Sequence, residues 1–153
     1  MGLIDFVRAA GEKIFGTSEA AASPTTDETV LSKRATALEA HVGKLGLPVE
    51  GLKIKVADDV AYVKGKVPTQ AEREKIVLAV GNVAGIAKVE DRLEVTNPQP
   101  EARYYTVAKG DTLSKISKEM YGDPNKYPQI FEANKPMLTH PDKIYPGQVL
   151  RIP

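Results

Sequence analysis

Residues 52–67 read LKIKVADDVAYVKGKV, and the pattern of this stretch decides the fold of the middle of the chain. Apolar residues occupy every second position in both halves, and lysines or a tyrosine lie between most of them. An apolar period of two is typical of a β-strand with one buried face. Asp58 and Asp59 separate the two halves and favour a turn. The stretch therefore predicts a β-hairpin.

Helical patterns flank this hairpin on both sides. Before it, apolar residues recur at steps of three and four and end at Gly46, at positions Leu31, Ala35, Leu38, Val42 and Leu45. After it, Thr69 and Glu72 form a capping-box pattern that opens a helix ending near Gly81. Residues 89–95 then alternate again as a third strand. The predicted order is α-β-β-α-β, a small sheet with its helices on one face.

Residues 103–153 predict a second small unit of order β-α-α-β. A short strand at Tyr105 and Val107 precedes a helix that carries Leu113, Ile116 and Met120. Pro124 suits the first turn of a second helix. A loop rich in proline follows, and residues 148–152 form the closing strand. Together the two units predict an α+β protein of two small domains.

Polar and proline-containing stretches set the expected boundaries. We expect an N-terminal helical segment at 1–16, a linker at 17–28, a first domain at 29–96, a linker at 97–102 and a second domain at 103–153. Each domain is small enough that its own core would be marginal, so docking between them would help.

Composition excludes several classes of function. The 21 basic and 20 acidic residues give a net charge of +1, which offers no long-range field for nucleic acid. No apolar run approaches the roughly 18 residues that span a bilayer, and the start of the chain lacks the features of a secretory signal. We therefore expect a cytoplasmic monomer without membrane insertion. Cysteine is absent, and His41 and His140 are not set in a catalytic pattern, so we expect no enzyme activity.

Two family resemblances rest on local motifs. The run from Tyr105 to Pro153, with GDTL at 110–113, IFEAN at 130–134 and IYPG at 144–147, resembles the LysM module along its whole length. The middle block, with Gly65 in its second strand and Gly85-Ile86 before its third, is similar to a BON domain. The two modules in this order, preceded by GLIDFVRAAGEKIF, resemble the family of bacterial cytoplasmic potassium-binding proteins with BON and LysM domains.

This resemblance implies a K⁺ site built from main-chain carbonyls, in a sensor or buffer that changes conformation on binding. Two predicted helices end at glycines, near Gly11 and Gly81, and the last carbonyls of a helix lack intrahelical partners. Each glycine alone would be an ordinary helix cap. We also expect glycine and Asn82 to supply positive φ angles that turn carbonyls inward. Rb⁺ or Cs⁺ would substitute for K⁺. The ligands carried over from the family are the carbonyls of Val7, Ala10, Gly81, Val83 and Ile86, with Glu12 a candidate sixth.

The LysM resemblance also implies a groove for glycans that contain N-acetylglucosamine. Its expected lining is Gly110, Asp111, Thr112, Leu113, Asn134 and Ile144. Peptidoglycan or glycan binding in the cell envelope is therefore the alternative function. A further alternative is an adaptor at a membrane surface that uses the outer face of the hairpin, where Lys53, Lys55, Lys64 and Lys66 should project. That face could equally be a solvated surface that discourages edge pairing.

Overall fold

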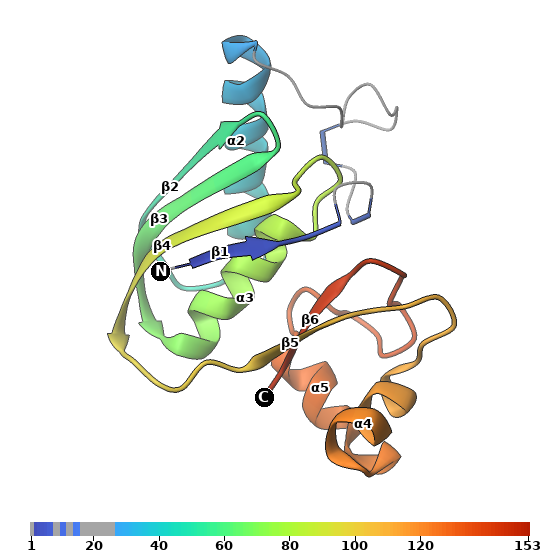
Figure 1. Ribbon diagram of the computed structural model, residues 1–153. Helices are drawn as coiled ribbons and strands as arrows, with labels where there is room; N and C mark the ends of the chain where they lie inside the picture. Colours follow the sequence, from blue (N-terminus) through green and yellow to red (C-terminus); the bar gives the residue numbers. More distant parts are fainter. Residues whose placement is uncertain (1, 8–9, 12–13, 16–26) are drawn as a thin grey trace.

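The computed structural model describes residues 2–7, 10–11, 14–15 and 27–153, and it contains two modules (Figure 1). The first module comprises β1 (Gly2–Asp5), α2 (Glu28–Lys44), β2 (Glu50–Ala57), β3 (Val60–Thr69), α3 (Gln70–Gly81) and β4 (Lys88–Asn97). The second comprises β5 (Arg103–Thr106), α4 (Leu113–Tyr121), the 3₁₀ turn η1 (Pro124–Lys126), α5 (Tyr127–Ala133) and β6 (Val149–Ile152). The predicted α+β class and the two element orders are confirmed.

The first module is a four-stranded sheet of order β1-β4-β3-β2. β2 and β3 form the predicted antiparallel hairpin around Asp58 and Asp59, and α3 links β3 to the parallel strand β4. Helices α2 and α3 cover one face of the sheet (Figure 1). The alternating apolar residues of the strands point to that face and form a core with Leu38, Val42 and Ile76, all nearly inaccessible to solvent.

The N-terminal residues correct one prediction, because residues 2–7 are not helical. Gly2–Asp5 forms strand β1, which pairs antiparallel with β4 and places Ile4 against the core. A free edge of β4 would expose a row of unpaired N–H and C=O groups, and β1 satisfies them. The rest of the expected helix at 8–9, 12–13 and 16, and the expected linker up to residue 26, lie outside the described residues.

The second module has its own core around an antiparallel pair, β5 and β6. Its apolar centre includes Ile116, Ile130 and Leu150. The expectation for Pro124 is wrong in detail: it opens the 3₁₀ turn η1, and Pro128 occupies the first turn of the helix α5. Proline suits both places, since the first N–H groups of a helix have no intrahelical acceptor.

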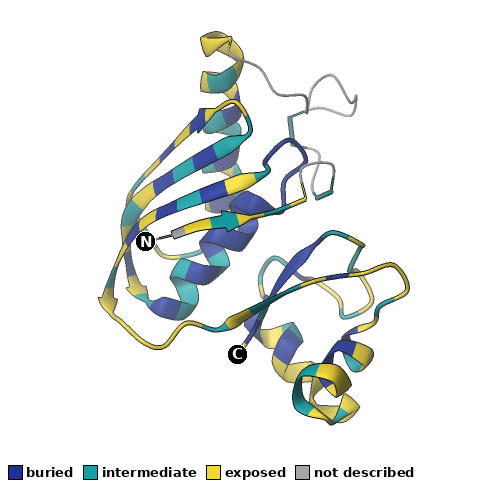
Figure 2. Ribbon diagram, viewed as in Figure 1, coloured by how far each residue is buried: buried dark blue, intermediate teal, exposed yellow. Residues whose placement is uncertain are grey.

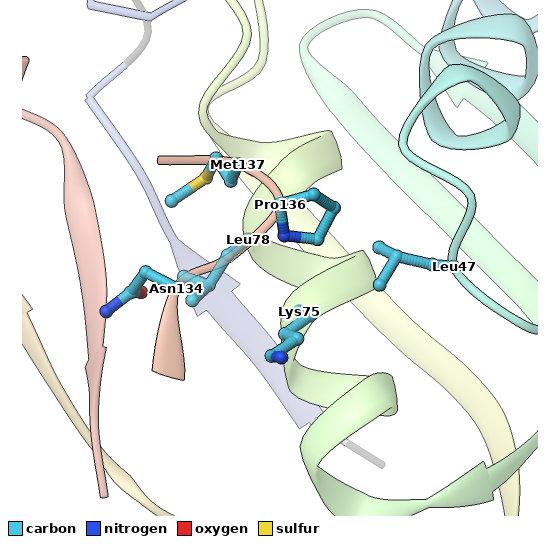
Figure 3. A pocket seen from close by; sticks show the side chains of 6 residues that line it. All are labelled: Leu47, Lys75, Leu78, Asn134, Pro136 and Met137. Atoms are coloured by element: carbon cyan, nitrogen blue, oxygen red, sulfur yellow. The ribbon is translucent and has the colours of Figure 1, made fainter. Parts of the chain in front are cut away.

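Helix α3 is buried on both sides because it lies between the sheet and the second module. Residues 76–81 are all buried, and Figure 2 shows α3 mostly dark blue. The side of α3 turned away from the sheet contacts β6 and the segment after α5. Figure 3 shows this seam, where Pro136 and Met137 meet Leu78 and Lys75 of α3. Burial lowers the pKa of Lys75. The apolar run at 76–80 thus reflects a helix with two neighbours.

The chain between the modules has no regular structure at residues 98–102, as the two prolines there predict. A buried carboxylate, that of Glu74, nevertheless holds this segment in place by hydrogen bonds. Glu74 of α3 accepts hydrogen bonds from the Ala102 amide at 3.0 Å and from Arg151 Nε of β6 at 2.7 Å. Across the described residues, no helix is long and apolar enough to span a bilayer.

Candidate functional site

The end of α3 lies against the segment that follows β1. The last helical hydrogen bond runs from the Asn82 amide to the Leu78 carbonyl at 2.9 Å. The Phe6 ring packs directly on Gly81, so a Cβ atom at residue 81 would collide with it. The Phe6 amide also donates to the Ala87 carbonyl at 2.8 Å. Residues 6–7 are thereby held beside the loop at 82–87.

Gly11 makes the second close approach between the two segments. Its φ angle is +105°, and a Cβ atom there would collide with the Asn82 carbonyl and lie 2.8 Å from the Val83 amide nitrogen. Both the angle and the contact favour glycine. The structure thus brings together the two glycine-containing stretches that the sequence analysis had paired, although they are 70 positions apart in the sequence.

One physical reason in the sequence analysis is wrong. We expected Gly81 and Asn82 to adopt positive φ angles, but Gly81 ends α3 without one, and Asn82 has φ −81°. Gly81 matters because a side chain would displace Phe6. Gly11 does have a positive φ angle, and so does Gly85, at +110°, between the proposed ligands Val83 and Ile86.

The predicted carbonyl ligands lie in or beside these two segments. The Val7 carbonyl accepts from the Ala10 amide at 3.0 Å, and the Val83 carbonyl accepts from the Ile86 amide at 3.1 Å. A carbonyl oxygen has two lone pairs, so each can still bind a cation. Residues 81–86 are all buried, and burial strengthens the field of these dipoles. Glu12, the candidate sixth ligand, lies outside the described residues.

Side-chain ligands for a metal are scarce in the part of the chain that the structure describes. No three His, Cys, Asp or Glu residues there gather into a group that could hold a metal ion. Asp58 and Asp59 form the hairpin turn, as predicted, and the Asp59 carbonyl accepts from the amides of Ala87 and Lys88. The main-chain carbonyls at the C-terminal end of α3 are neutral oxygens at the negative end of the helix dipole.

The expected glycan groove is only partly assembled. A groove of about 310 Å³ lies in the second module, and of the six predicted residues only Thr112 and Leu113 line it. The sequence analysis missed the rest of its lining, which is Ser114, Tyr127, His140, Pro141 and Asp142. No sequence signal marks this lining, because residues 112–114, Tyr127 and residues 140–142 come together only in the folded chain.

Two predicted groove residues instead hold the module together. Asp111 accepts from the Tyr105 hydroxyl at 2.7 Å and the Ala108 amide at 2.9 Å, and these bonds lower its pKa. Asn134 is 1% exposed, and its side chain pairs with both backbone groups of Arg151. Gly110 is exposed with a φ of +86°, and Ile144 packs against the second core.

The lysine face is placed as predicted. Lys53, Lys55, Lys64 and Lys66 are all exposed on the sheet face opposite the helices, with Lys53 directly across from Lys64. On the same face Arg92 forms an ion pair with Glu90 and stacks over the Tyr62 ring. Glu90 of β4 thus neutralises part of the positive charge on this sheet face.

Comparison with known proteins defines the class first. Residues 28–97 match the BON domain family and residues 105–153 match the LysM domain family, so the chain is a BON–LysM protein. Over 154 aligned positions it is 47% identical to the potassium binding protein Kbp of Escherichia coli, with 100% of this chain and 99% of that protein covered. The chain belongs to the family of that BON–LysM protein.

Two other relatives are more distant. Protein YqbP of Bacillus subtilis is 28% identical over 120 residues, which cover 69% of this chain and 55% of YqbP. Esterase Rv1288 of Mycobacterium tuberculosis is 36% identical over 84 residues, which cover 54% of this chain but only 17% of the esterase.

The two domain families that match this chain, BON and LysM, are binding modules rather than enzymes.

Proposed function

We propose that this protein binds K⁺ in the cytoplasm through main-chain carbonyls of Val7, Ala10, Gly81, Val83 and Ile86. The observation that carries the proposal is the contact of Phe6 and Gly11 with residues 81–83, because it gathers carbonyl-bearing segments from two distant parts of the chain. The name of the Escherichia coli relative, which is similar along the whole chain, supports the same ion.

Ion selectivity follows from the chemistry of neutral oxygens. K⁺ is weakly hydrated, and carbonyl dipoles can replace its water shell, as they do in potassium-channel filters. Mg²⁺ gives up its water reluctantly, and Ca²⁺ sites usually include carboxylates. We therefore expect K⁺, Rb⁺ and Cs⁺ to bind in preference to Na⁺ and the divalent ions.

A conformational response follows from the partial exposure of the N-terminal residues. β1 has four residues, and Leu3 and Val7 are about half exposed, at 55% and 45%. An ion shared by residues 7–10 and 81–86 would add a tie between these segments. Binding would then shift the population toward the docked arrangement, which suits either a sensor or a buffer of K⁺.

Thermal unfolding in KCl, NaCl and CaCl₂ at fixed ionic strength tests the proposal. A ligand that binds only the folded form stabilises it by about 2.7 kcal/mol at a hundredfold excess over Kd, so KCl should raise Tm most. A chain lacking residues 1–12 is the control, and it should lose this K⁺-specific increase. An equal effect of the three salts, or a larger one of CaCl₂, would contradict K⁺ binding.

A glycan function for the second module has one observation in its favour. The groove between Thr112–Ser114 and His140–Asp142 is also lined by Tyr127, which is 36% exposed, and an aromatic ring is a suitable surface for a sugar ring. Titration with N-acetylglucosamine oligomers, followed by amide chemical shifts, would test it. Shifts confined to these residues would support glycan binding, and their absence at saturating sugar would exclude it.

A further inference from the structure

Strand β6 has two edges, and among the described residues only β5 pairs with it as a strand. In an antiparallel pair, alternate residues direct their N–H and C=O groups away from the partner strand. On β6 these residues are Val149 and Arg151, whose backbone groups turn from β5 toward two asparagine side chains. The Asn134 side chain, from the same module, forms hydrogen bonds with both backbone groups of Arg151. The Asn82 side chain, from the other module, does the same with Val149.

The Asn82 side chain binds Val149 as a neighbouring strand would. Its Oδ1 accepts from the Val149 amide at 2.8 Å, and its Nδ2 donates to the Val149 carbonyl at 2.8 Å. The residue is 5% exposed, so water cannot readily replace these bonds. Its main chain lies between Gly81 and Val83, two of the proposed ligands. We call residues 81–86, which carry three of the proposed ligands, the ion loop. Asn82 therefore belongs to both the ion loop and the seam between modules.

Gly147, two residues before Val149, reaches the other half of the proposed site. A Cβ atom there would lie 2.8 Å from Ala10 Cβ and 3.2 Å from Val7 Cβ, and its φ angle is +88°. The segment 147–149 of the LysM module thus contacts the residues on either side of the ion position. It touches Val7 and Ala10 through Gly147 and holds Asn82 through Val149.

We propose that Asn82 is a positioning residue for the ion site, and that segment 147–149 sets K⁺ affinity by holding both groups of carbonyls in place. This inference rests on the proposed K⁺ function. Without the amide of Asn82, the loop at 81–83 loses its anchor, and the Val149 backbone groups lose buried partners. Linkage requires the converse effect as well: K⁺ must strengthen the bond between Asn82 and Val149.

Calorimetric titration of the full chain with KCl tests this inference on matched variants. Asn82→Ala should weaken K⁺ binding about tenfold, within the range of ordinary coupling between sites. Asn134→Ala removes the equivalent amide at the other end of β6, away from the ion loop, and should leave K⁺ affinity within about twofold. If the two variants weaken K⁺ equally, or if neither does, Asn82 has no special role.

Amide hydrogen exchange on the unaltered chain gives a second readout that does not depend on a variant folding. Adding K⁺ should raise the protection of the Val149 amide more than that of the Arg151 amide, which Asn134 holds. Equal changes at the two amides would overturn the inference. A chain that shows no K⁺ binding at all would overturn the proposed function itself, so the two failures can be told apart.

Discussion

Replacing Gly81 with alanine probes the contact that joins the two halves of the proposed site. Gly81 is the last residue of α3 and is buried under the Phe6 ring, and a methyl group there would overlap that ring. Alanine does not change the helical backbone, since Gly81 lacks a positive φ angle. The substitution therefore tests the close approach of Phe6 and leaves the course of the chain unaltered.

Two opposed effects determine how far Gly81→Ala changes the free energy of unfolding. Overpacking a filled site costs about 1–3 kcal/mol, since Phe6 must shift from a position packed against the core. Alanine in a helix gains about 0.5–1 kcal/mol over glycine. We expect a net loss of about 1 kcal/mol in the free energy of unfolding, which lowers Tm by about 2–4 °C for a chain of this size. The displaced Phe6 should also weaken the K⁺-dependent increase in Tm.

Gly43→Ala is the matched control for this experiment. Gly43 lies within α2, and a Cβ atom there would meet nothing within 4 Å. This variant should raise Tm, so the two alanines are expected to act in opposite directions. In a Phe6→Ala background, Gly81→Ala should become stabilising as well. If Gly81→Ala raises Tm in the unaltered chain as Gly43→Ala does, Phe6 does not pack on Gly81.

Two further predictions concern the seam and the second module. Glu74→Ala leaves the Arg151 guanidinium without its carboxylate and should lower the free energy of unfolding by about 3 kcal/mol, measured in urea. Glu74→Gln should have a smaller effect, and a loss below about 1 kcal/mol in Glu74→Ala would contradict a structural ion pair. The hydrogen bond to Asp111 raises the pKa of Tyr105 from 10.0 to about 12. The stability that this bond contributes is therefore fully present below pH 10 and is lost as the pH rises toward 12. In Tyr105→Phe, the free energy of unfolding should fall less steeply over this pH range.

Strong local periodicity made most of the fold predictable from the sequence. The alternation at 52–67 and the capping residue Thr69 specify their elements without help from distant contacts, and the structure contains both. The capping box did not reveal that the apolar run after Glu74 is buried on two sides, because its second neighbour is the distant second module. The pairing of the stretches around Gly11 and Gly81 came from family resemblance, since nothing in either stretch indicates the other.

Tertiary contacts decided what the sequence could not. Gly2–Asp5 is a strand only because β4 offers a free edge, and a four-residue segment has no periodicity of its own to reveal this. Asp111 and Asn134 were expected in a binding groove because the resemblance to the LysM module implied one there. Their hydrogen bonds go to Tyr105 and to the Arg151 backbone, partners that only the folded chain brings close.

The position of a bound ion tests the central claim most directly. Anomalous diffraction from crystals grown in RbCl would locate the ion, because Rb⁺ should replace K⁺ and scatters anomalously. We predict one strong peak between residues 7–10 and 81–86, within coordination distance of the five proposed carbonyl oxygens. A peak held instead by carboxylate side chains elsewhere, or no peak in crystals of protein that binds Rb⁺ in solution, would contradict this account.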